Sequence, residues 1–456
     1  MTLYQYNNHG ENLVIEEILN KKTEVNKTPI LETLNNYLSK NPLRMHVPFH
    51  NGFSNNDIIP KEIYNLDISE VSGYDVEGED NPIFQSEKIT AKHFNASHSF
   101  YLTGGASMGL VASLIALKKL GKKIILARNV HKSVINGVIL SGLEPVWLDV
   151  EFLDEWGIFS KIDSTKLFEI MSAHKDIAGC VIVSPTYEGI VSDVESIAQN
   201  CHIKNIPLIV DEAHGAHFYF LNNKKLYSAL QLGADLVIQS WHKSLGSLTQ
   251  TGVLHLANTN FFSYHDIKRS LDLVSSTSPS FLLLLSLELT RKHLTEAGDF
   301  PFNKTIKSLN LFLSSLKQIP EINLLKNQDF FKAYIKQSKI TGIDFAFNLY
   351  NNHSVEVESA NEIGCLISIG AAFNEDAREK LTNAIFATVH KNLSQNRLNG
   401  EKLVTKPQLD EFKLSPREAF FSGFQSQNKN LKYESEIKAP CPPGYVVKVP
   451  GSQKND

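Results

Sequence analysis

Short apolar runs alternate with amphipathic stretches between about residues 99 and 256. The runs are almost continuously hydrophobic, which suits strands that are covered on both faces of a parallel sheet. Between them, segments such as Ser192–Asn205 predict helices, with Ser192 and Glu195 forming a capping box at the start of that one. The alternation predicts an α/β domain with a mostly parallel sheet and helices on both faces. The candidate strands are Lys123–Ala127, Pro145–Asp149, Gly179–Ser184, Pro207–Asp211, Asp235–Gln239 and Gly252–Leu256.

The pattern changes near residue 300. Ile306–Gln318 and Asn374–Leu393 read as helices, and Ile340–Leu349 and Gly364–Ile369 read as strands, so we expect a smaller C-terminal α+β domain. A chain of 456 residues is long enough for two domains. We therefore expect an N-terminal helical arm (residues 1–40), a major domain (41–300) and a C-terminal small domain (301–456).

Composition excludes several classes of partner. The formal charge is −4, which gives no general attraction to nucleic acid or to an anionic membrane. Residues 1–22 are polar and predict no secretory signal, and the apolar run Phe281–Leu289 is too short to cross a membrane and predicts a buried helix. The four cysteines are widely spaced, which indicates reduced thiols in a cytoplasmic protein rather than disulfides or a metal site.

Polar residues follow the predicted strands, where ligands bind in such sheets. Lys243 comes just after one strand and is flanked by Ser240, His242 and Ser244. Hydroxyl groups and an imidazole suit a phosphate, while the lysine amine can form a Schiff base with a carbonyl. Taken alone, Lys243 could also be a surface lysine in a polar turn.

Asp211 ends another apolar run. A carboxylate there can keep a pyridine nitrogen protonated, because the opposite charge favours the cationic form. Considered alone, the same aspartate could simply cap the following turn.

Two further segments add to this pattern. Thr103–Gly109, with Gly105, Ala106 and Ser107, lies between a candidate strand and an apolar helix at Leu110–Leu120, where backbone N–H groups can bind phosphate. His131 follows the next strand, where an imidazole can stack on a planar cofactor. Neither segment is specific by itself. Together with Asp211 and Lys243, they predict an enzyme that uses pyridoxal 5′-phosphate (PLP), and they indicate no metal.

These residues belong to stretches that resemble the bacterial Orn/Lys/Arg decarboxylases. The resemblance implies PLP fold type I, with a major domain like that of aspartate aminotransferase. It covers most of the chain and rests on Met45–Gly52, Arg128–Gly137, Ser184–Gly189, Asp211–His217, Trp241–Gln250, Ser415–Phe421 and Pro442–Tyr445.

The resemblance also implies a role for each site residue. Lys243 would hold the cofactor, Asp211 would contact its ring nitrogen, Ala213 would pack under the ring and His131 would stack over it. The Ser276–Pro279 segment would reach the cofactor of a neighbouring subunit, which implies a homodimer with shared sites. The expected cofactor-binding set is Gly105, Ala106, Ser107, His131, Asp211, Ala213, His214, Ser240, His242, Lys243 and Thr277.

The implied reaction is decarboxylation of a basic amino acid to its amine. Arginine, lysine and ornithine all remain candidate substrates, and the product, a diamine or agmatine, would supply polyamine metabolism. Transamination or racemisation with the same cofactor is an alternative, as is a regulatory relative with weak catalysis. The chain resembles a short form of the family without the extra N-terminal domain, so the decameric assembly of the large members is not implied.

The sequence departs from the family pattern at several positions. Phe49 and Asn51 replace a glycine and a lysine, and Ala106 replaces a hydroxyl residue of the phosphate loop. Ser452 stands where the family usually has glutamate, and the Lys-Glu pair expected after Phe421 is absent. The first three changes leave the core cofactor residues intact. The changes at Ser452 and after Phe421 lie in the C-terminal domain, where they could affect the shape of the substrate pocket.

Overall fold

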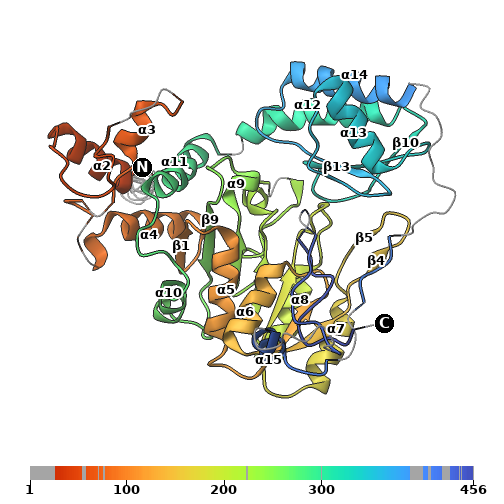
Figure 1. Cartoon of the computed structure of the whole chain (residues 1–456), viewed down its shortest axis with the longest axis horizontal. Helices are drawn as coiled ribbons and strands as arrows, with labels where there is room; N and C mark the ends of the chain where they lie inside the picture. The colour runs from red at the N-terminus through yellow and green to blue at the C-terminus, as the bar shows by residue number, and fades with distance from the viewer. Residues whose placement is uncertain are drawn as a thin grey trace, which may run out of the picture.

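The computed structural model contains a seven-stranded sheet, a four-stranded sheet and a two-stranded hairpin (Figure 1). The structure describes residues 26–454 apart from 54–57, 70, 75, 77, 222–223, 299, 391–403, 409–411, 424–431, 441 and 443. The stretch considered for a secretory signal lies outside the described residues. Within them, no helix combines the length and hydropathy that a membrane crossing requires.

The large sheet is mostly parallel, as predicted. Its strand order is β1-β9-β8-β7-β6-β2-β3, and only β9 runs antiparallel to its neighbours. All six candidate strands are confirmed, with ends that shift by at most two residues. The strands are β1 (His98–Leu102), β2 (Lys123–Ala127), β3 (Glu144–Leu148), β6 (Ile177–Val183), β7 (Leu208–Asp211), β8 (Leu236–Gln239) and β9 (Gly252–Leu256).

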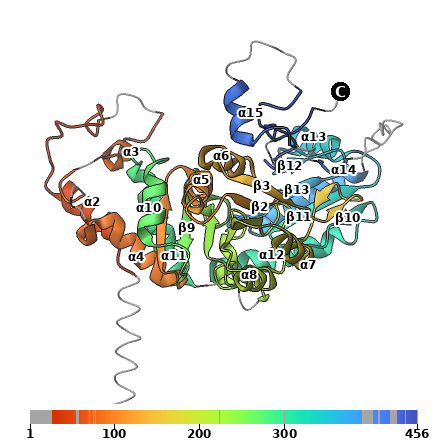
Figure 2. The same cartoon turned by 90° about the horizontal axis from the view of Figure 1, so that it is seen from below.

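Helices cover both faces of this sheet, which explains why its strands are so continuously apolar. Figure 2 shows α5 (Gly105–Leu117) and α6 (Lys132–Ser141) on one side of the strands, and α7 (Ser164–Ala173) and α8 (Val194–Ile203) on the other. The interior residues of β2, β7 and β8 are fully buried between these layers.

The predicted capping box at α8 is wrong. Asp193, not Ser192, is the N-cap residue, and its carboxylate accepts a hydrogen bond of 3.1 Å from the Ser196 N–H. The hydroxyl of Ser192 is buried and instead accepts a hydrogen bond of 3.1 Å from the Ile162 N–H. The Ser192 side chain therefore makes a tertiary hydrogen bond instead of the helix cap that the local pattern predicted.

The N-terminal helices pack beside α11 (Phe281–Ala297), which confirms the buried helix expected from its apolar run. Glu288 of α11 accepts hydrogen bonds from the Ile30 and Leu31 N–H groups, at 3.1 and 2.9 Å. These N–H groups begin a helix and have no partner within it, so the carboxylate caps α2 from outside. The elements here are α2 (Pro29–Ser39), α3 (Lys61–Leu66), η1 (Gly78–Asp80), α4 (Pro82–Phe94) and α10 (Tyr264–Asp272).

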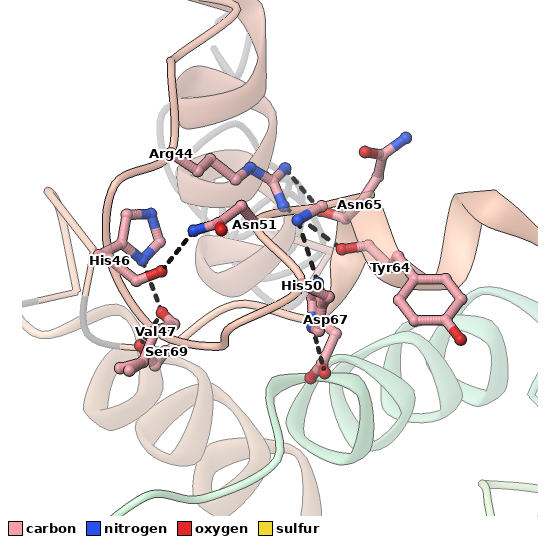
Figure 3. Close-up of polar contacts among 10 residues, drawn as sticks. Arg44, His46, Val47, His50, Asn51, Tyr64, Asn65, Asp67 and Ser69 are labelled. Atoms are coloured by element: carbon pink, nitrogen blue, oxygen red, sulfur yellow. Dashed lines mark hydrogen bonds and ion pairs between the residues drawn. The ribbon is translucent and has the colours of Figure 1, made fainter. Parts of the chain in front are cut away.

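Polar contacts join the loop at residues 40–53 to α3 and to the residues that follow it (Figure 3). The Arg44 guanidinium donates to the carbonyl oxygens of Tyr64 and Asn65, at 3.3 and 2.9 Å. His50 Nε2 lies 3.2 Å from an Asp67 carboxylate oxygen. These contacts fix the loop although it leaves large apolar side chains exposed.

The small sheet has the antiparallel order β10-β11-β13-β12. The predicted helices and the strand at Gly364–Ile369 are confirmed within the described residues. The predicted strand at Ile340–Leu349 is wrong, because these residues begin α13, where the Thr341 hydroxyl caps the Asp344 N–H at 3.0 Å. The elements are α12 (Phe300–Leu316), β10 (Ile322–Leu324), β11 (Lys332–Gln337), α13 (Gly342–His353), β12 (Ser359–Ala360), β13 (Cys365–Ser368) and α14 (Glu375–His390).

The chain after residue 404 returns to the large sheet (Figure 1). Helix α15 (Pro416–Gly423) contacts α6, and Val446 and Val449 are buried in the core of the large sheet. The buried Arg128 guanidinium donates a hydrogen bond of 2.6 Å to the Val446 carbonyl oxygen. A second hydrophobic core lies around the small sheet; it combines residues between 302 and 389 with Phe218, Leu221 and Leu226. The three-part division expected from the sequence stays a prediction.

Candidate active site

A cavity of about 410 Å³ opens at the carboxyl ends of the large sheet's strands. Its wall is built by segments that follow β1, β2, β6, β7 and β8, and by Tyr445 from the C-terminal segment. Ten of the eleven residues expected to bind the cofactor lie in this wall. They are Gly105, Ala106, Ser107, His131, Asp211, Ala213, His214, Ser240, His242 and Lys243.

Lys243 lies on the short helix α9 (Trp241–Ser244), directly after β8. Trp241 of the same turn is fully buried, which fixes the position of the turn. Lys243 Nζ lies 3.0 Å from His214 Nε2. Burial, together with the nearby charge of Lys243, lowers the pKa of His214 well below its ordinary value. His214 is therefore a neutral imidazole beside the lysine amine.

Asp211 ends β7 and is buried beneath the same cavity. Its carboxylate accepts a hydrogen bond of 3.1 Å from the Ala213 N–H. Burial raises the pKa of Asp211, and the positive charge of Lys243 opposes that rise only in part. A cation placed against this carboxylate would relieve the cost of its burial.

The glycine-rich segment is the first turn of α5, not a loop before it. The helix begins at Gly105, five residues earlier than predicted, and Gly105 has a φ of +73°, which glycine adopts without strain. The first N–H groups of a helix are unpaired and carry a partial positive charge, which suits a phosphate. Ser240 and His242 lie in the wall of the same cavity.

His131 follows β2 and is the N-cap residue of α6, with its Nδ1 accepting from the Ser133 N–H at 3.2 Å. Burial, followed by the charges of Lys243 and Lys132, lowers the pKa of His131 to about 4. Gly444 packs against the imidazole so closely that a Cβ there would lie 2.5 Å from His131 Cδ2. The ring is thus neutral, and the C-terminal segment holds it in place.

Thr277 is the one expected residue outside the cavity. It is exposed, in the segment between α10 and α11. Neighbouring Ser276 lines a second groove, whose apolar side chains include Met108, Val274 and Phe420 and which shares Ser107 with the first cavity. Within one chain, the Ser276–Pro279 segment therefore lies near the cavity without entering it.

The cavity also contains residues that the sequence did not single out. Glu188, Phe159 and Tyr445 line it, and Glu188 belongs to the Ser184–Gly189 stretch that follows β6. The position of that stretch after a strand could have indicated Glu188. Tyr445 has no such signal, because its place depends on the return of the C-terminal segment.

The polar groups of the wall fit PLP. Asn129 Oδ1 and His214 Nδ1 are buried without a hydrogen-bond partner in the described part of the chain. A lysine, a buried carboxylate and a helix N-terminus share the same cavity. These are the groups that an aromatic aldehyde with a ring nitrogen, a hydroxyl and a phosphate would bind.

The departures from the family pattern lie in different places. Ala106 lines the cavity and supplies no hydroxyl there. Phe49 is 98% exposed, and Asn51 adopts a φ of 53° in the loop of Figure 3. Ser452 is buried and lines a separate cavity with Lys448 and Glu434, so it does not enter the cavity of Lys243 in its own chain.

Comparison with known proteins identifies the family. A family model described as "Orn/Lys/Arg decarboxylase, major domain" matches residues 28–361. An arginine decarboxylase of Bacillus subtilis is 28% identical over 448 residues, which cover 93% of this chain and 91% of that protein. The lysine decarboxylase LdcA of Pseudomonas aeruginosa is 23% identical over 286 residues, or 58% of this chain and 37% of that protein.

Solved structures show the same fold. The constitutive lysine decarboxylase of Escherichia coli superposes with a TM-score of 0.76 at 16% identity, covering 99% of this chain and 80% of that one. Lysine decarboxylase A of Pseudomonas aeruginosa gives 0.75 at 17% identity, covering 99% and 77%. The expected fold class is therefore confirmed.

Proposed function

Because this chain belongs to the Orn/Lys/Arg decarboxylase family, we propose that it is a PLP-dependent decarboxylase of a basic amino acid. The substrate would be arginine, lysine or ornithine, and the product, agmatine or a diamine, would feed polyamine synthesis. The observation that carries the proposal is that Lys243, Asp211 and the N-terminus of α5 line one cavity.

The proposed roles follow from these positions. Lys243 holds the cofactor covalently, and Asp211 binds its ring nitrogen and keeps it protonated. The first turn of α5, with Ser107, binds the phosphate. Ser240 and His242 complete that site. His131 and Ala213 also line the cavity and would hold the cofactor ring between them.

When bound, PLP supplies an electron sink for the electron pair left at the α-carbon as carbon dioxide departs. The residues of the chain orient the substrate and move protons. Lys243 Nζ, 3.0 Å from His214 Nε2, is placed to return a proton to the α-carbon. Phe159, Val183 and Leu110 give the cavity apolar walls that limit access of water.

We also propose a cytoplasmic homodimer with active sites shared between subunits. The exposed Ser276–Pro279 segment lies beside an apolar groove that adjoins the cavity, and in a dimer Thr277 would complete the site of the partner subunit. Three of the four cysteines lie in the described residues as buried free thiols, which supports a reducing compartment.

The assignment of Lys243 is tested by absorption. The purified enzyme should be yellow with bound PLP, and borohydride should bleach the band by fixing the cofactor to Lys243. Lys243→Ala should lose the reducible band. Lys332→Met is the control at a second lysine, because Lys332 is buried, has a lowered pKa and does not line the cavity. A reducible band that survives Lys243→Ala would refute the assignment, whereas Lys332→Met should keep the band.

A further inference from the structure

A buried carboxylate faces the cavity from the segment after β6. We propose that Glu188 binds the positively charged end of the substrate side chain, a guanidinium or an ammonium group, and so selects basic amino acids. This inference rests on the proposed function and names the residue that would determine its substrate class. Glu188 lines the cavity and is only 7% exposed.

Glu188 forms no ion pair within the described part of the chain. Its carboxylate contacts the Thr186 hydroxyl and its own backbone N–H, and no lysine, arginine or histidine of the described residues forms an ion pair with it. Burial raises the pKa of Glu188 to about 7, and the charge of Lys332 is the weakest of the effects that oppose this rise. A cationic ligand would restore the ionised carboxylate, because an opposite charge within a buried site favours it.

The backbone around Glu188 is held rigidly by the small sheet's domain. Asn327 Nδ2 donates a hydrogen bond of 2.6 Å to the Glu188 carbonyl oxygen. The Gln328 and Asp329 N–H groups both donate to the Gly189 carbonyl oxygen, at 3.2 and 3.0 Å. Asp329 is itself fixed by an Oδ1 to His217 Nε2 distance of 3.1 Å within the core. The carboxylate is therefore pre-positioned, which reduces the entropy lost on binding.

The sheet order places Glu188 away from the phosphate end of the cavity. The first turn of α5 follows β1, whereas Glu188 follows β6, and β9, β8 and β7 lie between these strands. Four strand spacings of about 4.8 Å separate β1 from β6. Lys243 and Asp211, after β8 and β7, lie between the two ends. A substrate attached near Lys243 can therefore direct its side chain away from the phosphate and toward Glu188.

The wall near Glu188 suits the methylene groups of such a side chain. Phe159 and Tyr445 meet edge to face, with ring centroids 5.3 Å apart, and both line the cavity. Tyr187 lies beside His214, with ring centroids 4.9 Å apart. An apolar wall that ends in a buried carboxylate matches a hydrocarbon chain that ends in a cation.

The charge of Lys332 does not cancel that of Glu188. The ammonium of Lys332 donates a hydrogen bond of 2.7 Å to Ser368 Oγ, and its electrostatic neighbours include the carboxylates of Asp329, Glu358 and Glu188. Lys243 is a further neighbour, so three carboxylates face two ammonium groups, which leaves an excess of negative charge around Lys332. Burial also lowers the pKa of Lys332, which weakens its competition further.

The test compares product amines, which bind without turnover. Calorimetric titration of the PLP-loaded enzyme would use agmatine, cadaverine and putrescine, with pentylamine as the analogue that lacks a distal cation. Glu188→Gln should weaken the binding of at least one of the three products by about 10- to 100-fold, which is the range for a charged hydrogen bond. The affinity for pentylamine should stay unchanged. The product whose affinity falls most shows whether Glu188 binds a guanidinium or an ammonium group.

Matched variants separate this role from a structural one. Glu188→Asp keeps the charge, so it should still bind an amine with a distal cation more tightly than pentylamine, which lacks one. Glu195→Gln makes the same chemical change on an exposed residue in the first turn of α8, outside the cavity, and it should alter binding by less than about twofold. Loss of the PLP absorption band in Glu188→Gln would show misfolding. In that case the amine preference of Glu188→Asp decides whether Glu188 binds the distal cation.

The outcomes distinguish this inference from the proposed function. If the wild-type enzyme prefers a cationic product and Glu188→Gln keeps that preference, the assignment of Glu188 is wrong while the decarboxylase proposal stands. If the wild-type enzyme binds pentylamine as tightly as every cationic product, the proposed substrate class is itself refuted.

Discussion

Burial sets the protonation of the side chains around the cavity. It raises the pKa of Asp211 and Glu188 and lowers that of His131 and His214. In each case the low-dielectric surroundings disfavour the charged form. The cavity therefore contains neutral imidazoles beside carboxyl groups that gain from a bound cation, which suits a ligand with a protonated ring nitrogen and a cationic side chain.

The shift at His131 predicts a pH dependence of stability. Its pKa falls from 6.5 to about 4 in the folded chain, so between these values the unfolded chain binds a proton that the folded chain does not. Stability is therefore lost as the pH falls through this window, by at most about 3 kcal/mol from this residue. In urea denaturation without cofactor, the free energy of unfolding of His131→Phe should fall less between pH 6.5 and 4 than that of the wild type.

His174→Phe is the control for that measurement, because His174 is exposed at the end of α7 and should leave the wild-type pH dependence unchanged. An identical loss of stability in wild type and His131→Phe would show that His131 is not neutralised by folding.

At the residue scale, the sequence predicted best those side chains that directly follow a strand. Lys243, Asp211 and His131 were found because apolar runs mark the strand ends, and strand ends of a parallel sheet converge. Tyr445 could not be found in this way, because its contact with the cavity depends on residues more than 300 positions apart in the chain. Ser192 was misassigned because a distant N–H group competes for its hydroxyl.

The elements show where local pattern is ambiguous. The apolar content of Ile340–Leu349 fits either a strand or a buried helix face, and periodicity over so short a run does not decide between them. The Thr341 cap and the packing of Phe345 and Leu349 in the small core favour the helix. The start of α5 was missed for a related reason, since glycines usually indicate a loop, whereas here Gly105 begins the helix with a positive φ and Gly109 allows close packing against Leu102 and Ile238.

The segment between α10 and α11 carries a prediction at this scale. If Thr277 completes the partner subunit's site, Thr277→Arg should block that site, and Lys243→Ala should inactivate its own. Mixing and refolding the two inactive variants should restore activity, because a mixed dimer contains one site with an intact Lys243 and an intact Thr277.

Thr165→Arg serves as the control for that experiment, since it changes an exposed threonine on α7 and should remain active by itself. Activity of Thr277→Arg equal to the wild type, or a purified enzyme that sediments as an active monomer, would contradict the shared site.

At the scale of the whole molecule, the cavity lies where three parts of the chain meet. The large sheet supplies Lys243 and Asp211, and the small sheet's domain holds the backbone of Glu188. The C-terminal segment adds Tyr445 and packs Gly444 against His131. The alternation of strands and helices in the sequence predicted both sheets. It did not predict that the three parts of the chain meet at the cavity, because that contact depends on tertiary packing, which no local pattern records.

The most direct test of the account is product formation. The PLP-loaded enzyme would be incubated separately with arginine, lysine and ornithine, and carbon dioxide and amine would be measured together. We expect at least one of the three to yield both in equal amounts, with none formed by Lys243→Ala. Formation of a keto acid or of the D-enantiomer without carbon dioxide, or no reaction with any of the three, would contradict the proposed decarboxylase.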